Sequence, residues 1–132
     1  MKKFEILEHI SDFKIRAFGK TKEELFLNML SGMANSQKAE KLIKKATRKI
    51  KIKSLDFVAL LVDFLSEVLY LNQVNREIYN EAKFSKFTDT EIEGELIGQK
   101  VERFGEDIKA VTYHDLNVNQ KEDRTWEATV LF

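Results

Sequence analysis

The sequence predicts an α+β fold, with two helices packed on one face of a mostly antiparallel or mixed sheet of about six to seven strands. Apolar residues recur at helical spacing in two segments, and elsewhere they alternate with polar residues, which is typical of half-buried strands. The 132 residues include no proline and only five glycines, so no stretch resembles a linker. We therefore expect a single domain over residues 1–132.

Two short strands and a helix open the chain. Residues 3–7 and 13–17 alternate in polarity and predict strands, with a turn at 9–12 between them. Thr21 and Glu24 form a capping box, since the threonine hydroxyl can accept from the Glu24 amide while the Glu24 carboxylate reaches back. Leu25, Met29 and Met33 follow at helical spacing, which predicts a helix that ends near residues 35–36.

The next segments predict a loop, a strand and a central helix. Residues 37–46 are polar and basic and favour a loop, whereas 48–53 alternate with lysines on one face. Ser54 or Asp56 is then expected to cap a helix that is apolar around most of its circumference, as a central helix is. Its polar stripe is Asp63, Glu67 and Tyr70.

The second half favours sheet. Segments 84–87 and 91–98 predict weak strands, and 108–118 and 126–132 alternate strictly. Gly94 and Gly98 form a G-x-x-x-G pattern, which outside a membrane favours a strand with bulges.

Composition excludes several classes of function. The absence of cysteine excludes disulfides, zinc fingers and cysteine nucleophiles, and two histidines are too few for a three-imidazole metal site. The longest purely apolar run, residues 57–62, is far short of the roughly 20 residues that span a bilayer. An acidic residue near the start argues against a signal peptide, so we expect a cytoplasmic protein without a membrane partner.

Charge cancels over the whole chain, with 22 basic and 22 acidic residues, but not locally. Residues 38–53 hold eight basic side chains against Glu40, and 89–107 hold seven acidic ones against Lys100 and Arg103. The sequence therefore predicts a dipolar molecule. Two solvated faces explain this better than steering of a charged partner, because committed nucleic-acid binders are usually basic overall.

Isolated polar residues give weak signals of chemistry. The chain has no phosphate-binding glycine loop and no nucleophile elbow. Asp63 and Glu67 lie one helical turn apart, which fits a metal or acid–base pair but fits a solvated stripe better. By spacing alone, Asp12 is a turn residue and His114 is a core histidine, the alternative for His114 being a titrating or partner-contacting group at a strand edge.

One segment is specific. Residues 107–116, Asp-Ile-Lys-Ala-Val-Thr-Tyr-His-Asp-Leu, closely resemble the late signature strand of the archease family. Residues 4–12 resemble the opening His-Thr-Ala-Asp segment of that family, with Ile-Ser in place of Thr-Ala. Residues 16–26 and 60–70 are similar to the entry into its first helix and to its central helix. The resemblance thus covers nearly the whole chain in order.

The resemblance implies an accessory protein rather than an enzyme. Archeases assist the RNA-splicing ligase that joins RNA ends after tRNA introns are excised, and they promote ligase guanylylation and multiple turnover. The expected partner is therefore the RNA-splicing ligase, with RNA contacted indirectly or weakly and with no small-molecule substrate. The resemblance also implies a partner or functional surface that includes His9, Lys109, Tyr113 and His114.

The family carries an acidic divalent-metal site, which matches this chain in part. Asp12 corresponds to its first ligand, and Glu40 is an offset candidate for the glutamate after the first helix. The family's Asp near the C-terminus is missing after Phe132. We therefore expect weak binding of calcium or magnesium, since calcium takes six to eight oxygen ligands.

Two other functions remain open. A stand-alone RNA-binding or protein-interaction module could use the basic segment 38–53, although no interleaved aromatics support RNA stacking there. A small enzyme could use Asp12, Asp63 and Glu67, but the sequence supplies neither a nucleophile nor a cofactor loop.

Overall fold

The structure, a computed structural model, describes residues 2–7 and 13–132. Over these residues it has two helices and seven strands. In chain order they are β1 (Phe4–Leu7), β2 (Lys14–Gly19), α1 (Lys22–Ser36), β3 (Ala39–Lys53), α2 (Phe57–Asn75), β4 (Glu77–Phe87), β5 (Glu91–Phe104), β6 (Thr112–Gln120) and β7 (Trp126–Leu131). The turn expected at residues 9–12 lies outside the described residues.

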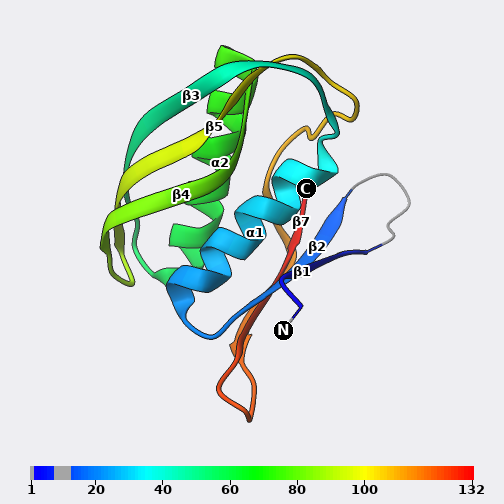
Figure 1. The fold of residues 1–132 in the computed structure, drawn as a ribbon. Coiled ribbons are helices and arrows are strands. Elements are labelled where there is room, and N and C mark those ends of the chain that lie inside the picture. The colour runs from blue at the N-terminus through cyan, green and yellow to red at the C-terminus, as the bar shows by residue number, and fades with distance from the viewer. Residues whose placement is uncertain (1, 8–12) are drawn as a thin grey trace.

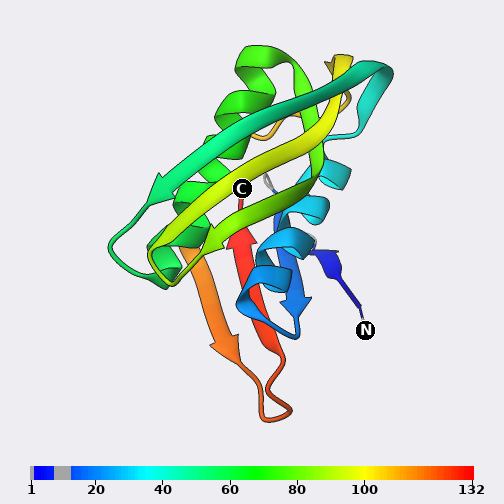
Figure 2. The same cartoon turned by 60° about the vertical axis from the view of Figure 1, so that its left-hand side comes forward.

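The strands form two antiparallel sheets rather than one. The four-stranded sheet has the order β1-β2-β7-β6, and the three-stranded sheet has the order β3-β5-β4. Figure 2 shows the last strand, β7, between β2 and β6. The α+β class, the two helices and the number of strands are confirmed. The division into two sheets could not be predicted from the alternation of apolar and polar residues alone.

Both helices lie against both sheets (Figure 1). Helix α1 contacts β1, β2 and β7 of one sheet and β4 of the other, and α2 contacts β3, β4 and β6. One hydrophobic core therefore includes side chains from both helices and both sheets, such as Ile15, Phe26, Phe64, Leu96 and Val130. Burial of these large apolar side chains is the main stabilising contribution to such a fold.

The expected Thr21 cap begins α1, while the Glu24 carboxylate reaches back to Lys20, one residue before the cap, rather than to Thr21. The Thr21 hydroxyl accepts from the Glu24 amide at 3.0 Å, and the Glu24 carboxylate accepts from the Lys20 amide at 3.1 Å. These bonds satisfy amides that have no partner inside the helix. Gly32 faces the strands, where an added Cβ would lie 3.0 Å from Ile15 and 3.1 Å from Phe4, so glycine lets α1 approach the sheet closely.

Helix α2 is capped by Asp56, one of the two expected residues, whose carboxylate accepts from the Ala59 amide at 2.8 Å. It is the one helix of the described chain that is long and apolar enough to cross a membrane, judged by length and composition. Leu60, Leu61 and Leu65 are fully buried in the protein core. We therefore interpret α2 as the central core helix that its apolar circumference predicts.

The loop expected at residues 37–46 is wrong, because β3 already begins at Ala39. The first half of β3 is exposed and charged, so its sequence does not show the alternation of apolar residues that predicts a strand. It is a strand because it pairs with β5. Likewise, β4 begins at Glu77, earlier than the predicted 84–87 segment. Its register shifts near Tyr79 and Phe84, which breaks a simple alternation.

The expected bulges at Gly94 and Gly98 are confirmed. Gly98 lies opposite Tyr79 and Gly94 opposite Phe84, and the register of β4 shifts at both places. A Cβ on Gly98 would lie only 1.8 Å from the Ile78 carbonyl oxygen. Glycine is therefore required here because the backbone of β4 approaches Gly98 too closely for a side chain.

Candidate functional site

The segment that resembles the family signature forms a bulge at the edge of the four-stranded sheet. Thr112 pairs with Leu131, but the next paired residues are Asn117 and Thr129. Four residues of β6, 113–116, therefore stand opposite a single residue of β7. The Thr112 hydroxyl donates to the Leu131 carbonyl at 3.0 Å, which holds the start of the bulge against β7.

The bulge turns polar and aromatic side chains toward solvent. Tyr113 is 57% exposed, and the His114 side chain is 70% exposed, 3.4 Å from the Asp115 carboxylate. Asp115 has a φ of 55°, in the left-handed region. The interpretation of His114 as a core histidine is wrong because this bulge breaks the alternation that suggested it.

The residues before β6 are anchored on α2 instead of continuing the strand. Ile108 is almost fully buried, and its carbonyl accepts from the Gln73 side chain at 3.2 Å. Lys109 and Ala110, which follow, are exposed. The strand expected at 108–118 therefore begins at Thr112, and Lys109 lies in the exposed segment that leads into the bulge.

The flanks of the opening segment lie at the same end of this sheet. Lys14 pairs with Leu131, and the Phe132 amide donates to the Phe13 carbonyl at 2.7 Å. Leu131 also pairs with Thr112. The chain just after residue 12, the end of β7 and the start of the bulged strand therefore meet. His9 and Asp12 themselves lie outside the described residues.

The described acidic residues do not fit a metal centre. Glu40 is engaged by Arg103, whose Nε lies 3.2 Å from its Oε2. Over residues 2–7 and 13–132, no three His, Cys, Asp or Glu side chains gather as a metal-binding group. Asp63 accepts a 2.6 Å hydrogen bond from the Ser54 hydroxyl, which ties the start of α2 to the end of β3.

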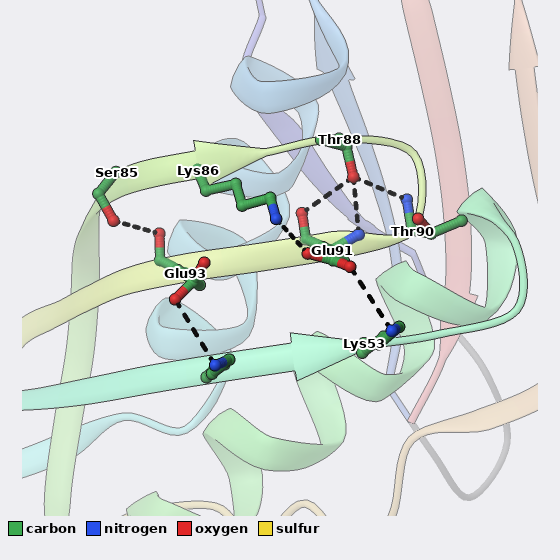
Figure 3. A network of polar contacts seen from close by, with 8 residues as sticks. Lys53, Ser85, Lys86, Thr88, Thr90, Glu91 and Glu93 are labelled. Atoms are coloured by element: carbon green, nitrogen blue, oxygen red, sulfur yellow. Dashed lines mark hydrogen bonds and ion pairs between the residues drawn. The ribbon is translucent and has the colours of Figure 1, made fainter.

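The basic segment and the acidic segment lie side by side, so the predicted dipolar molecule is wrong. Lys49, Lys51 and Lys53 of β3 stand opposite Glu95, Glu93 and Glu91 of β5. Lys53 and Lys51 lie 3.8 and 4.0 Å from their glutamates, and Lys86 of β4 also pairs with Glu91, as Figure 3 shows. This lysine face therefore carries its own counter-charges, which disfavours phosphate binding.

The inner side of the same sheet holds a polar cluster that sequence patterns did not reveal. Arg48 donates to both oxygens of the buried Glu77 carboxylate at 2.8 Å, and the Tyr79 hydroxyl donates to Glu77 at 2.5 Å. The guanidinium lowers the pKa of Glu77, and burial raises the pKa of Tyr79 to about 12. Arg48 lies far from Glu77 and Tyr79 in sequence, and only the alternation of these residues with core residues could have suggested inward side chains.

Comparison with known proteins then decides the family. Residues 4–132 match the model of the archease protein family (MTH1598/TM1083). The chain belongs to the archease family. It is 37% identical to the protein archease of Methanosarcina barkeri, over 98% of this chain and 94% of that protein. It is 31% identical to the protein archease of Thermococcus kodakarensis, over 97% and 96% of the two chains.

Solved structures agree with this family fold. A solution structure of Methanobacterium thermoautotrophicum protein 1598 is similar with a TM-score of 0.72 and 25% identity, covering 100% of this chain and 99% of that one. A crystal structure from Thermotoga maritima, described as an archease and possible chaperone, has a TM-score of 0.69 and 19% identity over 100% and 96% of the chains. This second likeness concerns the fold alone. The chain is thus an archease-type accessory protein rather than an enzyme.

Proposed function

We propose that this archease binds an RNA-splicing ligase, promotes formation of the ligase–guanylate intermediate and supports multiple turnover. The observation that supports this most directly is the bulge at residues 113–116. The segment most similar to the family signature is exposed at a sheet edge, where Tyr113 and His114 contribute little to the core. Exposed aromatic side chains at an irregular edge suit contact with a protein partner.

An accessory protein of this kind acts by preferring one conformation of the ligase. It can shift the ligase only by the difference between its affinities for the two conformations. We therefore expect guanylylation and turnover to rise together when this archease is added. Because one copy can be reused, amounts below the ligase concentration suffice.

Ligase assays test this proposal. Turnover and guanylylation of the cognate ligase are measured over a range of archease concentrations. Tyr113→Ala and His114→Ala should reduce the stimulation several-fold without lowering the thermal midpoint, since both side chains are exposed. Glu122→Ala, on the exposed turn after β6, is the matched control. No stimulation by the folded, unmodified chain would refute the proposal.

The proposal includes a divalent cation that binds with low affinity. Asp12 would supply one carboxylate, while Glu40 is held by Arg103. We expect calcium or magnesium to bind with a dissociation constant of roughly 10⁻⁴–10⁻³ M, as poorly charged oxygen sites do. Asp12→Asn should abolish this binding in isothermal titration, and an added Asp after Phe132 should tighten it. Micromolar binding that survives Asp12→Asn would place the cation elsewhere.

A further inference from the structure

Residues 107–111, the connecting segment, link the two sheets and carry the first half of the family signature. They follow β5 of the three-stranded sheet and precede β6 of the four-stranded sheet (the amber trace after β5 in Figure 1). No helix or strand includes them. The position of Lys109, and the angle at which the chain enters the bulge, therefore depend on how this segment is held.

Backbone and hydroxyl contacts fix the two ends of the connecting segment. Just before it, the Glu106 amide donates to the Gln37 carbonyl at the end of α1, at 3.1 Å. Just after it, the Thr112 hydroxyl donates to the Leu131 carbonyl of β7 at 3.0 Å. Within the described part of the chain, residues 107–111 make no hydrogen bond between backbone groups. Side chains must therefore set their conformation.

Apolar burial and one hydrogen bond hold the middle of the segment. Ile108 is only 3% exposed, and Val111 is partly buried against the same core. The side-chain amide of Gln73, on α2, donates to the Ile108 carbonyl at 3.2 Å. Over the residues that the structure describes, this is the one hydrogen bond that the connecting segment makes.

The hydrogen bond from Gln73 fixes the peptide group between Ile108 and Lys109. Burial of the Ile108 side chain alone would leave this peptide group free to rotate about ψ of Ile108. In a planar trans peptide the carbonyl and the amide point in opposite directions. Because the Ile108 carbonyl points toward Gln73, the Lys109 amide points away from it. Gln73 thus sets the direction in which the chain runs toward Tyr113 and His114.

We propose that Gln73 is a positioning residue, whose amide holds Lys109 and the start of the bulge in the conformation that the RNA ligase binds. Gln73 acts through the Ile108 carbonyl and needs no contact with the ligase. The inference rests on the proposed function, because the ligase is the partner. Without the donor, the connecting segment would occupy further orientations. The apparent affinity then falls with the fraction of molecules that keep the binding conformation.

Gln73→Met and Gln73→Lys test the donor. Methionine keeps the length of the side chain and favours the helix, but it cannot donate. We expect the affinity for the ligase, measured by isothermal titration, to fall roughly two- to tenfold, the range that corresponds to one net hydrogen bond. Gln73→Lys, whose ammonium group can donate to the same carbonyl, should recover most of the affinity. Equal losses in the two variants would overturn the inference.

Thr21→Ala separates positioning from stability. This substitution removes the cap of α1, at the opposite end of that helix from Gln37. It should lower the thermal midpoint at least as much as Gln73→Met does, because a lost cap and a lost hydrogen bond cost similar free energies. Thr21→Ala should nevertheless bind the ligase like the unmodified chain. A loss of affinity equal to that of Gln73→Met would assign the effect to stability and overturn the inference.

Nuclear magnetic resonance follows the connecting segment without the ligase. The order parameters of the Lys109 and Ala110 amides should fall in Gln73→Met and recover in Gln73→Lys. Unchanged order parameters in Gln73→Met would overturn the inference. If the unmodified chain binds and stimulates the ligase and Gln73→Met binds equally well, the positioning role is wrong and the proposed function stands. If the unmodified chain neither binds nor stimulates the ligase, both fail.

Discussion

The two faces of the three-stranded sheet both carry pairs of basic and acidic side chains, yet the pairs differ in kind. On the inner face, Arg48 holds the buried Glu77 carboxylate with two hydrogen bonds of 2.8 Å. On the outer face, Lys51 and Lys53 lie 4.0 and 3.8 Å from glutamates, and the lysine side chains are 82% exposed.

The difference shows that strand register and solvent access decide how much an ion pair contributes to the stability of the fold. Exposed pairs at such distances contribute little, because water and salt screen them. A bidentate pair whose carboxylate is buried fixes the positions of its elements, because Glu77 without Arg48 would be a poorly solvated charge. The inner cluster is therefore structural, and the outer rows mainly keep the sheet soluble and its edge unattractive to other chains.

Gly98→Ala should have the largest effect. The new Cβ would lie 1.8 Å from the Ile78 carbonyl oxygen, so β4 and β5 must separate beside the inner cluster. We expect a loss of about 3 kcal/mol or more in the free energy of unfolding, as forced overpacking produces. Urea denaturation measures it. Gly105→Ala, in the exposed turn after β5, is a milder comparison, and an equal loss there would contradict the close-approach argument.

Glu77→Gln should rank second. Glutamine keeps a partner for Tyr79 but leaves Arg48 without its carboxylate; because Arg48 is partly exposed, water replaces some of the loss. We expect about 2 kcal/mol less stability, below the range for a fully buried pair. Glu93→Gln on the outer face is the matched control. If the two substitutions cost the same, burial does not distinguish the two faces.

The pH dependence of stability should report on the inner cluster. The Arg48 hydrogen bonds lower the pKa of Glu77, so its contribution is present above about pH 4.5 and is lost as the pH falls. The pKa of Tyr79 is raised from 10.0 to about 12, so its contribution is lost as the pH rises between these values. Thermal midpoints across pH test both limbs, and Glu77→Gln should flatten the acidic one.

Neutralising Lys49, Lys51 and Lys53 should have the smallest effect. Their glutamate neighbours already balance this face, so both the stability and any weak RNA affinity should change little. The salt dependence of RNA binding is the sensitive measurement. A slope that falls by about one unit per lost phosphate contact would show that the lysines bind RNA and that the glutamates do not neutralise this face.

The sequence predicted the features that depend on local pattern. Both helices, the Thr21 and Asp56 caps and the bulges at the two glycines follow from residue type and spacing. Contacts between segments that are distant in the chain could not be predicted from the sequence. The pairing of Lys51 with Glu93 and the cluster of Arg48 with Glu77 depend on which strands become neighbours, which no periodicity encodes.

The candidate site was predicted in outline only. Residues 107–116 stood out by resemblance, but their strict alternation predicted a regular strand with an inward His114. The anchoring of Ile108 on α2 and the left-handed Asp115 produce the bulge instead, and both depend on the tertiary fold. The contact surface assigned to Lys109, Tyr113 and His114, like the one-domain organisation and the cytoplasmic location, stays a prediction.

The central place of β7 has a consequence for synthesis on the ribosome. The strands β3, β4 and β5 are consecutive along the chain and enclose α2 in sequence, so this half can assemble once Phe104 has emerged. The N-terminal strands β1 and β2 can pair with each other early, but the other edge of β2 must wait for β7, which follows more than a hundred residues later. During that interval the apolar side chains Ile15 and Ala17 lack their final sheet neighbours. Slow translation of the last segment would therefore prolong the exposure of the apolar side chains of β2, which favours aggregation. The N-terminal half of the molecule is where a nascent chain would most need a chaperone.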